Sequence, residues 1–190
     1  MNNRIPRAKG FTLVELLVVM TIIAVLAGGI FAAAPGAIAR TRRLQGTQIA
    51  VALAQSISSF REDNNRYPFP GGTKQERHQS DNTFMVNLTG KDDTINKKRE
   101  NYLSGLPMAK GATSPASGVY IKGDTTSVFD PWGNYYEIYL DHDGDDEITN
   151  PEGGEPLPLK IGVISKGQDM TISGQNPEGK DATRDNCKSW

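Results

Sequence analysis

The sequence predicts an α+β fold in which a long, kinked N-terminal helix packs on a small antiparallel β-sheet with long loops. Three observations predict it: an apolar block of helical length, an apolar stripe of helical spacing after it, and then short segments rich in β-branched and aromatic residues between turn formers. Hydrophobic residues make up 37% of the chain, charged residues 23%, and the formal net charge is -1. Because no global positive charge is present, we expect no nucleic-acid partner.

The apolar block extends from Phe11 to Ala34 and contains one ionisable side chain, Glu15. A helix of this length measures about 36 Å, which is enough to cross the hydrocarbon core of a bilayer. Residues 1–10 carry basic side chains and no acidic one. Positive charge before a membrane span favours a cytoplasmic N-terminus. We therefore predict a leader at 1–10, a single transmembrane helix at 11–36, and export of everything that follows.

Two simpler interpretations of this block are a secretory signal peptide and a plain signal anchor. A secretory signal peptide has an apolar region of about 7–15 residues, and this block is longer. A plain signal anchor explains the length and the basic flank but not Glu15. A carboxylate near the centre of a bilayer costs about 2.5–3.5 kcal/mol, so such a residue usually marks a function.

Residues 37–65 are expected to form the amphipathic half of the same helix. Pro35 interrupts the block and predicts a kink. Beyond it, Ile49, Leu53, Ile57 and Phe60 have the spacing of one apolar helical face. The helix is expected to end in the polar run at 61–65.

Residues 66–190 are expected to form a globular α+β domain. The strand candidates are Gly118–Lys122, Tyr135–Leu140 and Leu159–Ser165, which we place in one antiparallel sheet covered by the helix. An apolar cluster at 84–88 predicts a short helix inside a long charged loop. Trp132, in a Pro-Trp-Gly-Asn turn, is expected in the core.

An acidic loop follows the second strand candidate and offers ligands for a cation. In an EF-hand-like numbering, Asp141, Asp143 and Asp145 take positions 1, 3 and 5, the Glu147 carbonyl takes position 7, and Glu152 takes position 12. Closely spaced hard oxygen ligands favour Ca²⁺. Asp146 stands where glycine is usual, and a solvated acidic turn is the alternative.

The sequence offers no catalytic constellation, so we expect a protein that is not an enzyme. Cys187, the one cysteine, has no evident histidine partner, and His142 is expected to face solvent within the acidic loop. Neither a phosphate-binding loop nor a hydrolase serine motif is present.

The segment Lys9-Gly10-Phe11-Thr12-Leu13-Val14-Glu15 resembles the processing site of type IV pilins and type II secretion pseudopilins. The resemblance implies a pilin-like fold and a prepilin peptidase that cuts after Gly10 and methylates Phe11. It also implies that the new ammonium group of Phe11 pairs with Glu15 of a neighbouring subunit, so that both charges are compensated inside the membrane.

A second resemblance lies in the globular domain. Asp130-Pro131-Trp132-Gly133-Asn134 and the later segment 165–169 are similar to the major pseudopilins of type II secretion. This implies calcium binding in the loop nearer the C-terminus, with Ser165, Asp169 and Asp185 as the alternative ligands. Pilus-forming relatives usually close that loop with a disulfide, which a lone Cys187 cannot form within the chain.

Together these resemblances imply a structural subunit that self-associates into a helical filament and drives the export of folded proteins across the outer membrane. The implied partners are the prepilin peptidase, minor pseudopilins, and an inner-membrane assembly platform with a cytoplasmic ATPase. The chain would cross the inner membrane once, with its C-terminal domain in the periplasm. Two alternatives stay open: a type IV pilus subunit for adhesion, twitching or DNA uptake, and a signal-anchored, calcium-dependent binding module.

Overall fold

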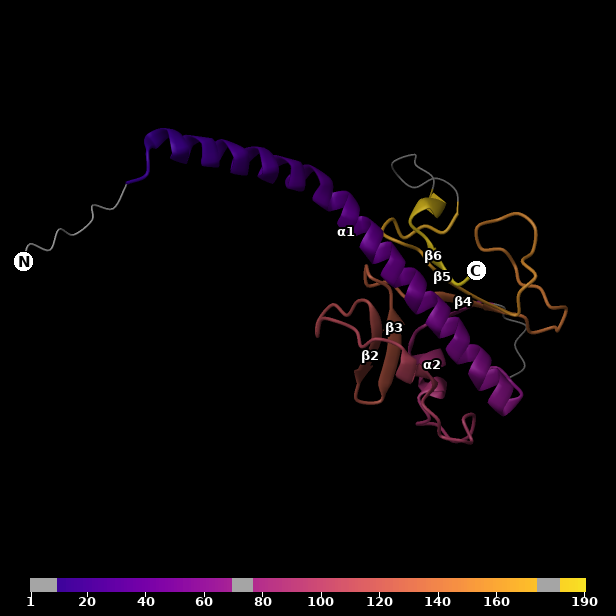
Figure 1. Ribbon diagram of the computed structural model, residues 1–190. Coiled ribbons are helices and arrows are strands. Elements are labelled where there is room, and N and C mark those ends of the chain that lie inside the picture. Colours follow the sequence, from indigo (N-terminus) through magenta and orange to yellow (C-terminus); the bar gives the residue numbers. More distant parts are fainter. Residues whose placement is uncertain (1–9, 70–76, 174–181) are drawn as a thin grey trace, which may run out of the picture. The chain divides into compact units, whose positions relative to one another are not determined.

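The computed structural model describes residues 10–69, 77–173 and 182–190 (Figure 1). Within the predicted leader, residues 1–9 lie outside the described residues. The chain divides into two compact units, Met1–Arg40 and Thr41–Trp190. Helix α1, Leu13–Asn64, contributes to both units and continues without interruption past Pro35.

The part of α1 within the second unit buries the predicted apolar stripe. Ile49 is 3% exposed, and Leu53, Ile57 and Phe60 are fully buried, so this prediction is confirmed. The helix ends at Asn64, inside the predicted polar run. Asn65 follows with φ 51°, the left-handed conformation that commonly terminates helices and that asparagine tolerates.

The second unit contains two antiparallel sheets. A four-stranded sheet has the order β1-β4-β5-β6, and a separate hairpin pairs β2 with β3. The strands are β1 (Arg77–Gln79), β2 (Gly118–Lys122), β3 (Thr125–Phe129), β4 (Glu137–Leu140), β5 (Ile161–Ser165) and β6 (Cys187–Lys188). The single sheet expected from the sequence is therefore wrong.

The strand candidates themselves were placed well, and the error concerns their partners. The candidate at 118–122 is β2 with the predicted bounds, but it pairs with β3 across a turn in which Gly123 has φ +59°. The other two candidates became β4 and β5, paired through Ile138 and Val163. Strands β1, β3 and β6 were missed. Strand β1 consists of three polar residues, β3 begins with three polar residues, and β6 has only two residues, so none of them carries an alternating apolar pattern.

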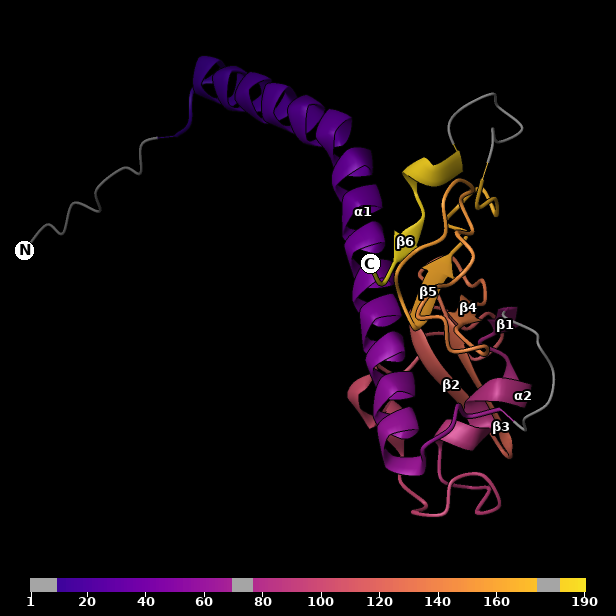
Figure 2. The ribbon, with the colours of Figure 1, turned by 90° about the vertical axis from the view of Figure 1, so that its right-hand side faces the viewer.

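The four-stranded sheet is covered on both faces, which the sequence did not predict. On one face, Ile138, Leu140 and Val163 join the main core with the stripe of α1. On the other face, Tyr139 and Ile164 pack against Ile148 in a second, smaller cluster. All of β4 is consequently buried. In Figures 1 and 2, the strands and the part of α1 in this unit lie side by side.

Short helices fill the connection between β1 and β2. Helix α2, Asn82–Met85, is capped by Asp81, whose Oδ1 accepts a hydrogen bond from the Thr83 amide at 3.0 Å. It continues into a 3-10 turn at Val86–Leu88, so the short helix predicted here is confirmed. Further 3-10 turns occupy Tyr102–Gly105 and Ala182–Arg184.

Candidate functional site

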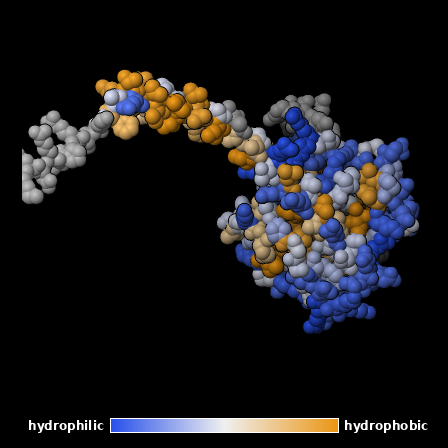
Figure 3. All heavy atoms as spheres, viewed as in Figure 1, coloured by the Kyte–Doolittle hydropathy of each residue, from blue (hydrophilic) through white to orange (hydrophobic). Residues whose placement is uncertain are grey.

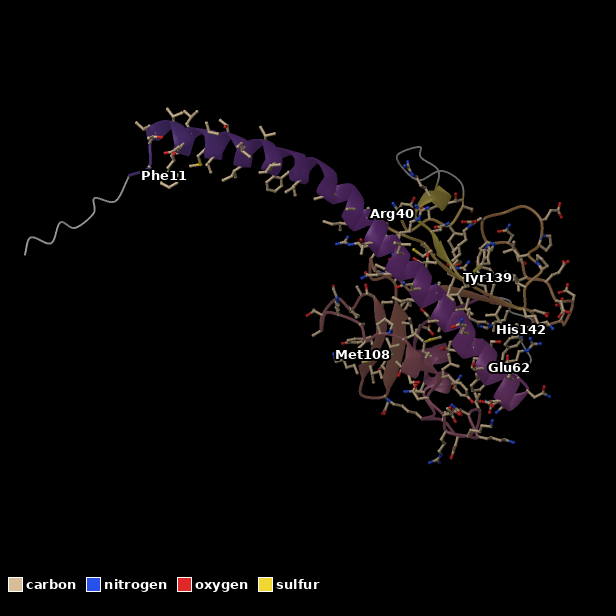
Figure 4. The ribbon with its side chains drawn as sticks, in the orientation of Figure 1. Phe11, Arg40, Glu62, Met108, Tyr139 and His142 are labelled. Carbon is tan, nitrogen blue, oxygen red and sulfur yellow. The ribbon has the colours of Figure 1, made fainter. Side chains whose placement is uncertain are left out.

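The first unit presents a continuous apolar surface. Figure 3 shows hydrophobic side chains along the N-terminal part of α1, and Figure 4 marks Phe11 just before it. Leu13 is 87% exposed and Phe31 is 79% exposed. In the part of the chain that the structure describes, one helix, α1, is long enough and apolar enough to cross a membrane. An apolar surface of this kind marks a segment that lipid or other proteins cover.

Glu15 lies in the first turn of α1 and is held by Thr12. Glu15 Oε2 accepts hydrogen bonds from the Thr12 amide at 2.9 Å and from Thr12 Oγ1 at 2.8 Å. The Glu15 amide returns a longer bond to Thr12 Oγ1 at 3.3 Å. This reciprocal arrangement is a capping box, and it places a negative charge at the positive end of the helix. The role of Thr12 was missed, although the Thr-x-x-Glu spacing is visible in the sequence.

The acidic loop brings together three of its predicted ligands. One carboxylate oxygen from each of Asp141, Asp143 and Asp145 lies within 4.8 Å of the others. Asp141 is buried, and its two oxygens accept bonds from the amides of Gly144, at 2.6 Å, and Asp146, at 3.2 Å. The loop is thus folded around Asp141, with the other two carboxylates exposed to solvent.

The remaining positions of the acidic loop have different surroundings. Asp146 adopts φ 65°, the conformation that glycine normally supplies at this position, and its carboxylate pairs with Lys160 at 2.7 Å. Glu147 donates its amide to Asp145 Oδ1 at 3.0 Å. Glu152 pairs with Lys188 and accepts a hydrogen bond from Asn186, and its carboxylate is not part of the three-residue cluster.

The alternative ligands are brought near one another by hydrogen bonds across the C-terminal part of the chain. Asp185 Oδ2 accepts bonds from the Gln168 amide at 2.6 Å and the Asp169 amide at 3.3 Å. Ser165 is buried, and its hydroxyl donates to Asp130 Oδ2 at 2.5 Å. Ser165 therefore already has a carboxylate partner. Asp185 is joined to the backbone amide of Asp169, whose own carboxylate accepts a bond from the Thr171 amide at 2.9 Å.

Asn186, which follows Asp185 in the chain, holds a buried acceptor that finds no donor among the described residues. Asn186 is 4% exposed, and its amide nitrogen donates to Glu152 at 2.9 Å and to the Ile172 carbonyl at 2.8 Å. Its Oδ1 makes no hydrogen bond with residues 10–69, 77–173 or 182–190. A buried carbonyl oxygen without a donor has a free energy cost that a bound water or cation can remove.

Asp130 organises the turn that the sequence singled out. Its carboxylate accepts bonds from the amides of Trp132 and Asn134, both at 2.8 Å, besides the bond from Ser165. Asp130 is fully buried, but Trp132 is only partly buried, so the core position expected for Trp132 is wrong. The buried member of the motif is its aspartate, because the turn wraps its amides around that carboxylate.

Cys187 lies on β6 against α1. Its Sγ is 3.3 Å from the Arg43 carbonyl oxygen, and a Cβ built on Gly46 would approach that sulfur to 2.5 Å. Tyr136 donates its hydroxyl to the Gly46 carbonyl at 2.9 Å. Burial raises the pKa of the Cys187 thiol to about 11, so at neutral pH the sulfur is a protonated packing group and not a nucleophile.

The structure corrects one prediction about a side chain and adds a buried carboxylate that the sequence did not single out. His142, expected to face solvent, is partly buried, and its ring contacts His78 and Tyr67. Glu137, which the sequence did not single out, is buried and pairs with Arg77 at 3.1 Å and Lys166 at 3.0 Å. No local sequence pattern identifies these pairs, since they depend on strand register.

Comparisons with known proteins agree with this geometry. The family model described as the prokaryotic N-terminal methylation motif matches residues 5–31. The chain is 25% identical to the type II secretion system core protein G of Pectobacterium carotovorum subsp. carotovorum over 132 residues. This aligned stretch covers 70% of this chain and 67% of that protein. No solved structure matches the chain significantly. The motif and the match support a pilin-like pseudopilin, and with the apolar helix they suggest a membrane-anchored envelope protein.

Proposed function

We propose that this chain is a structural subunit of a type II secretion pseudopilus. A prepilin peptidase would cut it after Gly10 and methylate Phe11, and the mature subunits would polymerise and drive folded proteins across the outer membrane. The observation that carries the proposal is an exposed apolar helix whose first turn holds a carboxylate, directly after a methylation motif. An apolar helix surface of this size requires lipid or other subunits to cover it.

Glu15 is proposed as the residue that sets the stagger between subunits. Both described bonds to its carboxylate end on Oε2 and come from Thr12. Oε1 is the atom that we assign to the ammonium group of Phe11 from a neighbouring subunit. Such a pair compensates two charges that would otherwise be costly at membrane depth. Thr12 would act as a positioning residue, because it fixes the side chain of Glu15 before a partner arrives.

Assembly places the subunit among several partners. We propose insertion in the inner membrane with the C-terminal domain in the periplasm, followed by extraction through an assembly platform powered by a cytoplasmic ATPase. Minor pseudopilins would share the filament. The protein would have no catalytic role of its own, in keeping with a buried, protonated Cys187 and with carboxylates already engaged by neighbouring groups.

The test is complementation of a strain that lacks this chain. We expect secreted enzymes to accumulate in the periplasm of the deletion strain and to reach the medium when the wild-type chain is restored. Gly10→Val should fail to restore secretion. A Cβ at Gly10 meets no atom within 4 Å, so this change acts on processing and not on packing. Normal secretion without the chain, together with loss of surface pili, would instead favour a type IV pilus subunit.

We also propose that the globular domain binds Ca²⁺ through Asp141, Asp143 and Asp145, with the Glu147 carbonyl nearby. The support is the approach of three hard oxygen ligands and the left-handed Asp146 that lets the loop turn. The second set, Ser165, Asp169 and Asp185, is supported by the hydrogen bonds from the amides of Gln168 and Asp169 that fold this segment onto the Asp185 carboxylate. A cation at either place would stabilise a loop-rich domain by mass action.

Chelation distinguishes these possibilities. We expect a chelator to lower the melting temperature of the wild-type chain and calcium to restore it. Asp143→Asn should abolish the shift if the first set binds, whereas Asp169→Asn should abolish it if the second set binds. Both aspartates are outside the core, so neither variant should unfold the domain. Calcium binding would be contradicted if the chelator leaves the melting temperature unchanged and elemental analysis finds no calcium.

A further inference from the structure

The two histidines of the chain meet in the globular unit although 64 residues separate them. His78 lies in β1, and His142 follows β4, where Figure 4 labels it. The Nε2 atoms of the two rings are 3.3 Å apart, and the ring planes are inclined by 70°. The register explains the meeting, because His78 pairs with Ile138, and His142 comes just beyond the end of that strand.

We propose that His78 and His142 together bind a divalent transition-metal ion of the zinc type, with water completing its coordination. Two imidazole nitrogens on one tetrahedral Zn²⁺, each at about 2.0–2.1 Å, lie about 3.3–3.4 Å from each other. The observed separation of 3.3 Å matches that geometry. Without an ion, the same two nitrogens are within hydrogen-bond distance, with the donor set by the tautomer.

Both rings are held in place by aromatic neighbours, so a metal would meet a preorganised pair. The His78 ring lies 4.1 Å from the ring of Phe69 and 5.4 Å from that of Phe84, measured between centroids. The His142 ring packs edge-to-face on Tyr67 at 5.3 Å. Rings fixed by packing lose little conformational freedom when they bind an ion, which favours affinity.

The surroundings allow an ion to reach the pair. His78 lines a surface cavity of about 390 Å³ together with Phe69, Asp81 and Phe84, and His142 is only partly buried. Imidazole nitrogen suits zinc, copper and nickel, whereas the neighbouring carboxylates of the acidic loop suit calcium. The two kinds of site are therefore chemically distinct even though Asp141 precedes His142 in the chain.

A metal at this position would join two parts of the globular unit. Among the described strands, β1 is an edge strand of three residues, and it pairs with β4. His142 is the second residue of the acidic loop and lies beyond the end of β4. An ion bridging the histidines would fasten this edge of the sheet to the loop, independently of the proposed pseudopilin function.

The test is titration of the tag-free, full-length chain in detergent with Zn²⁺, in the presence of excess Ca²⁺ to occupy carboxylate sites. We expect one Zn²⁺ per chain and, with Co²⁺ as a probe, the intense visible absorption of a tetrahedral ion. His142→Gln should raise the zinc dissociation constant at least about tenfold, a loss of the size that weaker perturbations of metal sites already cause. His78→Phe should do the same while keeping an aromatic ring between Phe69 and Phe84.

Asp124→Asn, at an exposed aspartate outside the acidic loop, serves as the matched control and should leave zinc binding unchanged. Circular dichroism of each variant would verify that the fold persists. The proposal is overturned if the wild-type chain binds no zinc with defined stoichiometry, or if His142→Gln binds it as tightly as the wild type. It is equally overturned if Asp143→Asn, and not His142→Gln, abolishes binding, since the acidic loop would then be the site.

Discussion

The two units of this chain treat apolar and charged groups in opposite ways. In the first unit, large side chains such as Leu13 and Phe31 are mostly exposed, and the Glu15 carboxylate is bound by Thr12, a residue three positions away. In the second unit, α1 and β4 bury their apolar residues within the chain itself. The difference teaches that the second unit completes its own core, whereas the first requires an apolar environment supplied from outside.

The buried carboxylates sharpen this contrast. Asp130 and Glu137 are each engaged by groups distant in sequence, so their charges are compensated by the fold of the second unit. Among the described residues, the Glu15 carboxylate is hydrogen-bonded by Thr12, three positions earlier in the same helical turn. If the first unit is built for assembly and the second for stability, changes in the two units must have separable effects.

The largest separable effect is expected at Glu15. Glu15→Leu should leave the helix long and apolar enough for membrane insertion and should abolish filament formation, because the ammonium of a neighbouring Phe11 then has no partner. Sedimentation of sheared filaments measures assembly, and membrane fractionation measures insertion. Glu62→Leu is the matched control on the same helix, and it should assemble normally. A normal yield of filaments from the Glu15→Leu variant would contradict an assembly role for Glu15.

Asp130 provides the next largest effect, on stability and not on insertion. Asp130→Ala should lower the free energy of unfolding by about 3–5 kcal/mol, because it leaves several buried donors without an acceptor. Chemical denaturation followed by circular dichroism measures the change. Asp143→Asn, at an exposed aspartate of the same unit, should change the free energy of unfolding far less when calcium is absent. Equal effects would show that the Asp130 network contributes little.

Valine substitutions at two glycines of α1, one in each unit, test the difference between the units directly. Gly46→Val should destabilise the second unit by about 1–3 kcal/mol, since even a Cβ there would lie 2.5 Å from Cys187 Sγ and 3.2 Å from Pro131 Cδ. A Cβ at Gly36 meets no atom within 4 Å, so Gly36→Val should leave that unfolding transition unchanged. Adding Cys187→Ala should recover part of the Gly46→Val loss. If the losses of free energy from Gly46→Val and Cys187→Ala simply add in the double variant, the Cys187 sulfur is not what the new side chain meets.

The smallest effect is chemical and concerns Cys187. Burial raises the pKa of its thiol to about 11, so at pH 8 only a small fraction is thiolate, and that fraction grows as pH rises toward 11. The native chain should react slowly with a thiol reagent at pH 8 and at the rate of a free thiol once unfolded by denaturant. Rapid labelling of the native chain would show that β6 does not protect the sulfur.

The sequence predicted the features that local patterns encode. The stripe at Ile49, Leu53 and Ile57, the helix end near Asn64, and the bounds of β2 all follow from periodicity and turn chemistry. The division into two sheets could not be predicted, because strand pairing depends on partners far along the chain. Strand β6 has only two residues and is defined by its pairing with β5.

The candidate sites show the same limit. The spacing of Asp141, Asp143 and Asp145 is visible in the sequence, and the structure gathers their oxygens. The engagement of Glu152 by Lys188, and of Ser165 by Asp130, arises from long-range packing that no spacing reveals. The meeting of His78 and His142 is of the same kind, whereas the capping role of Thr12 was readable from a four-residue motif.

The central claim is that the first unit is processed for assembly. Mass spectrometry of the N-terminus, on protein extracted from membranes of cells that contain the prepilin peptidase, tests it most directly. The account predicts a chain that begins at Phe11 and carries one added methyl group on its amine. A chain that retains residues 1–10, or one that begins beyond the apolar block after cleavage as a secretory signal, would contradict it.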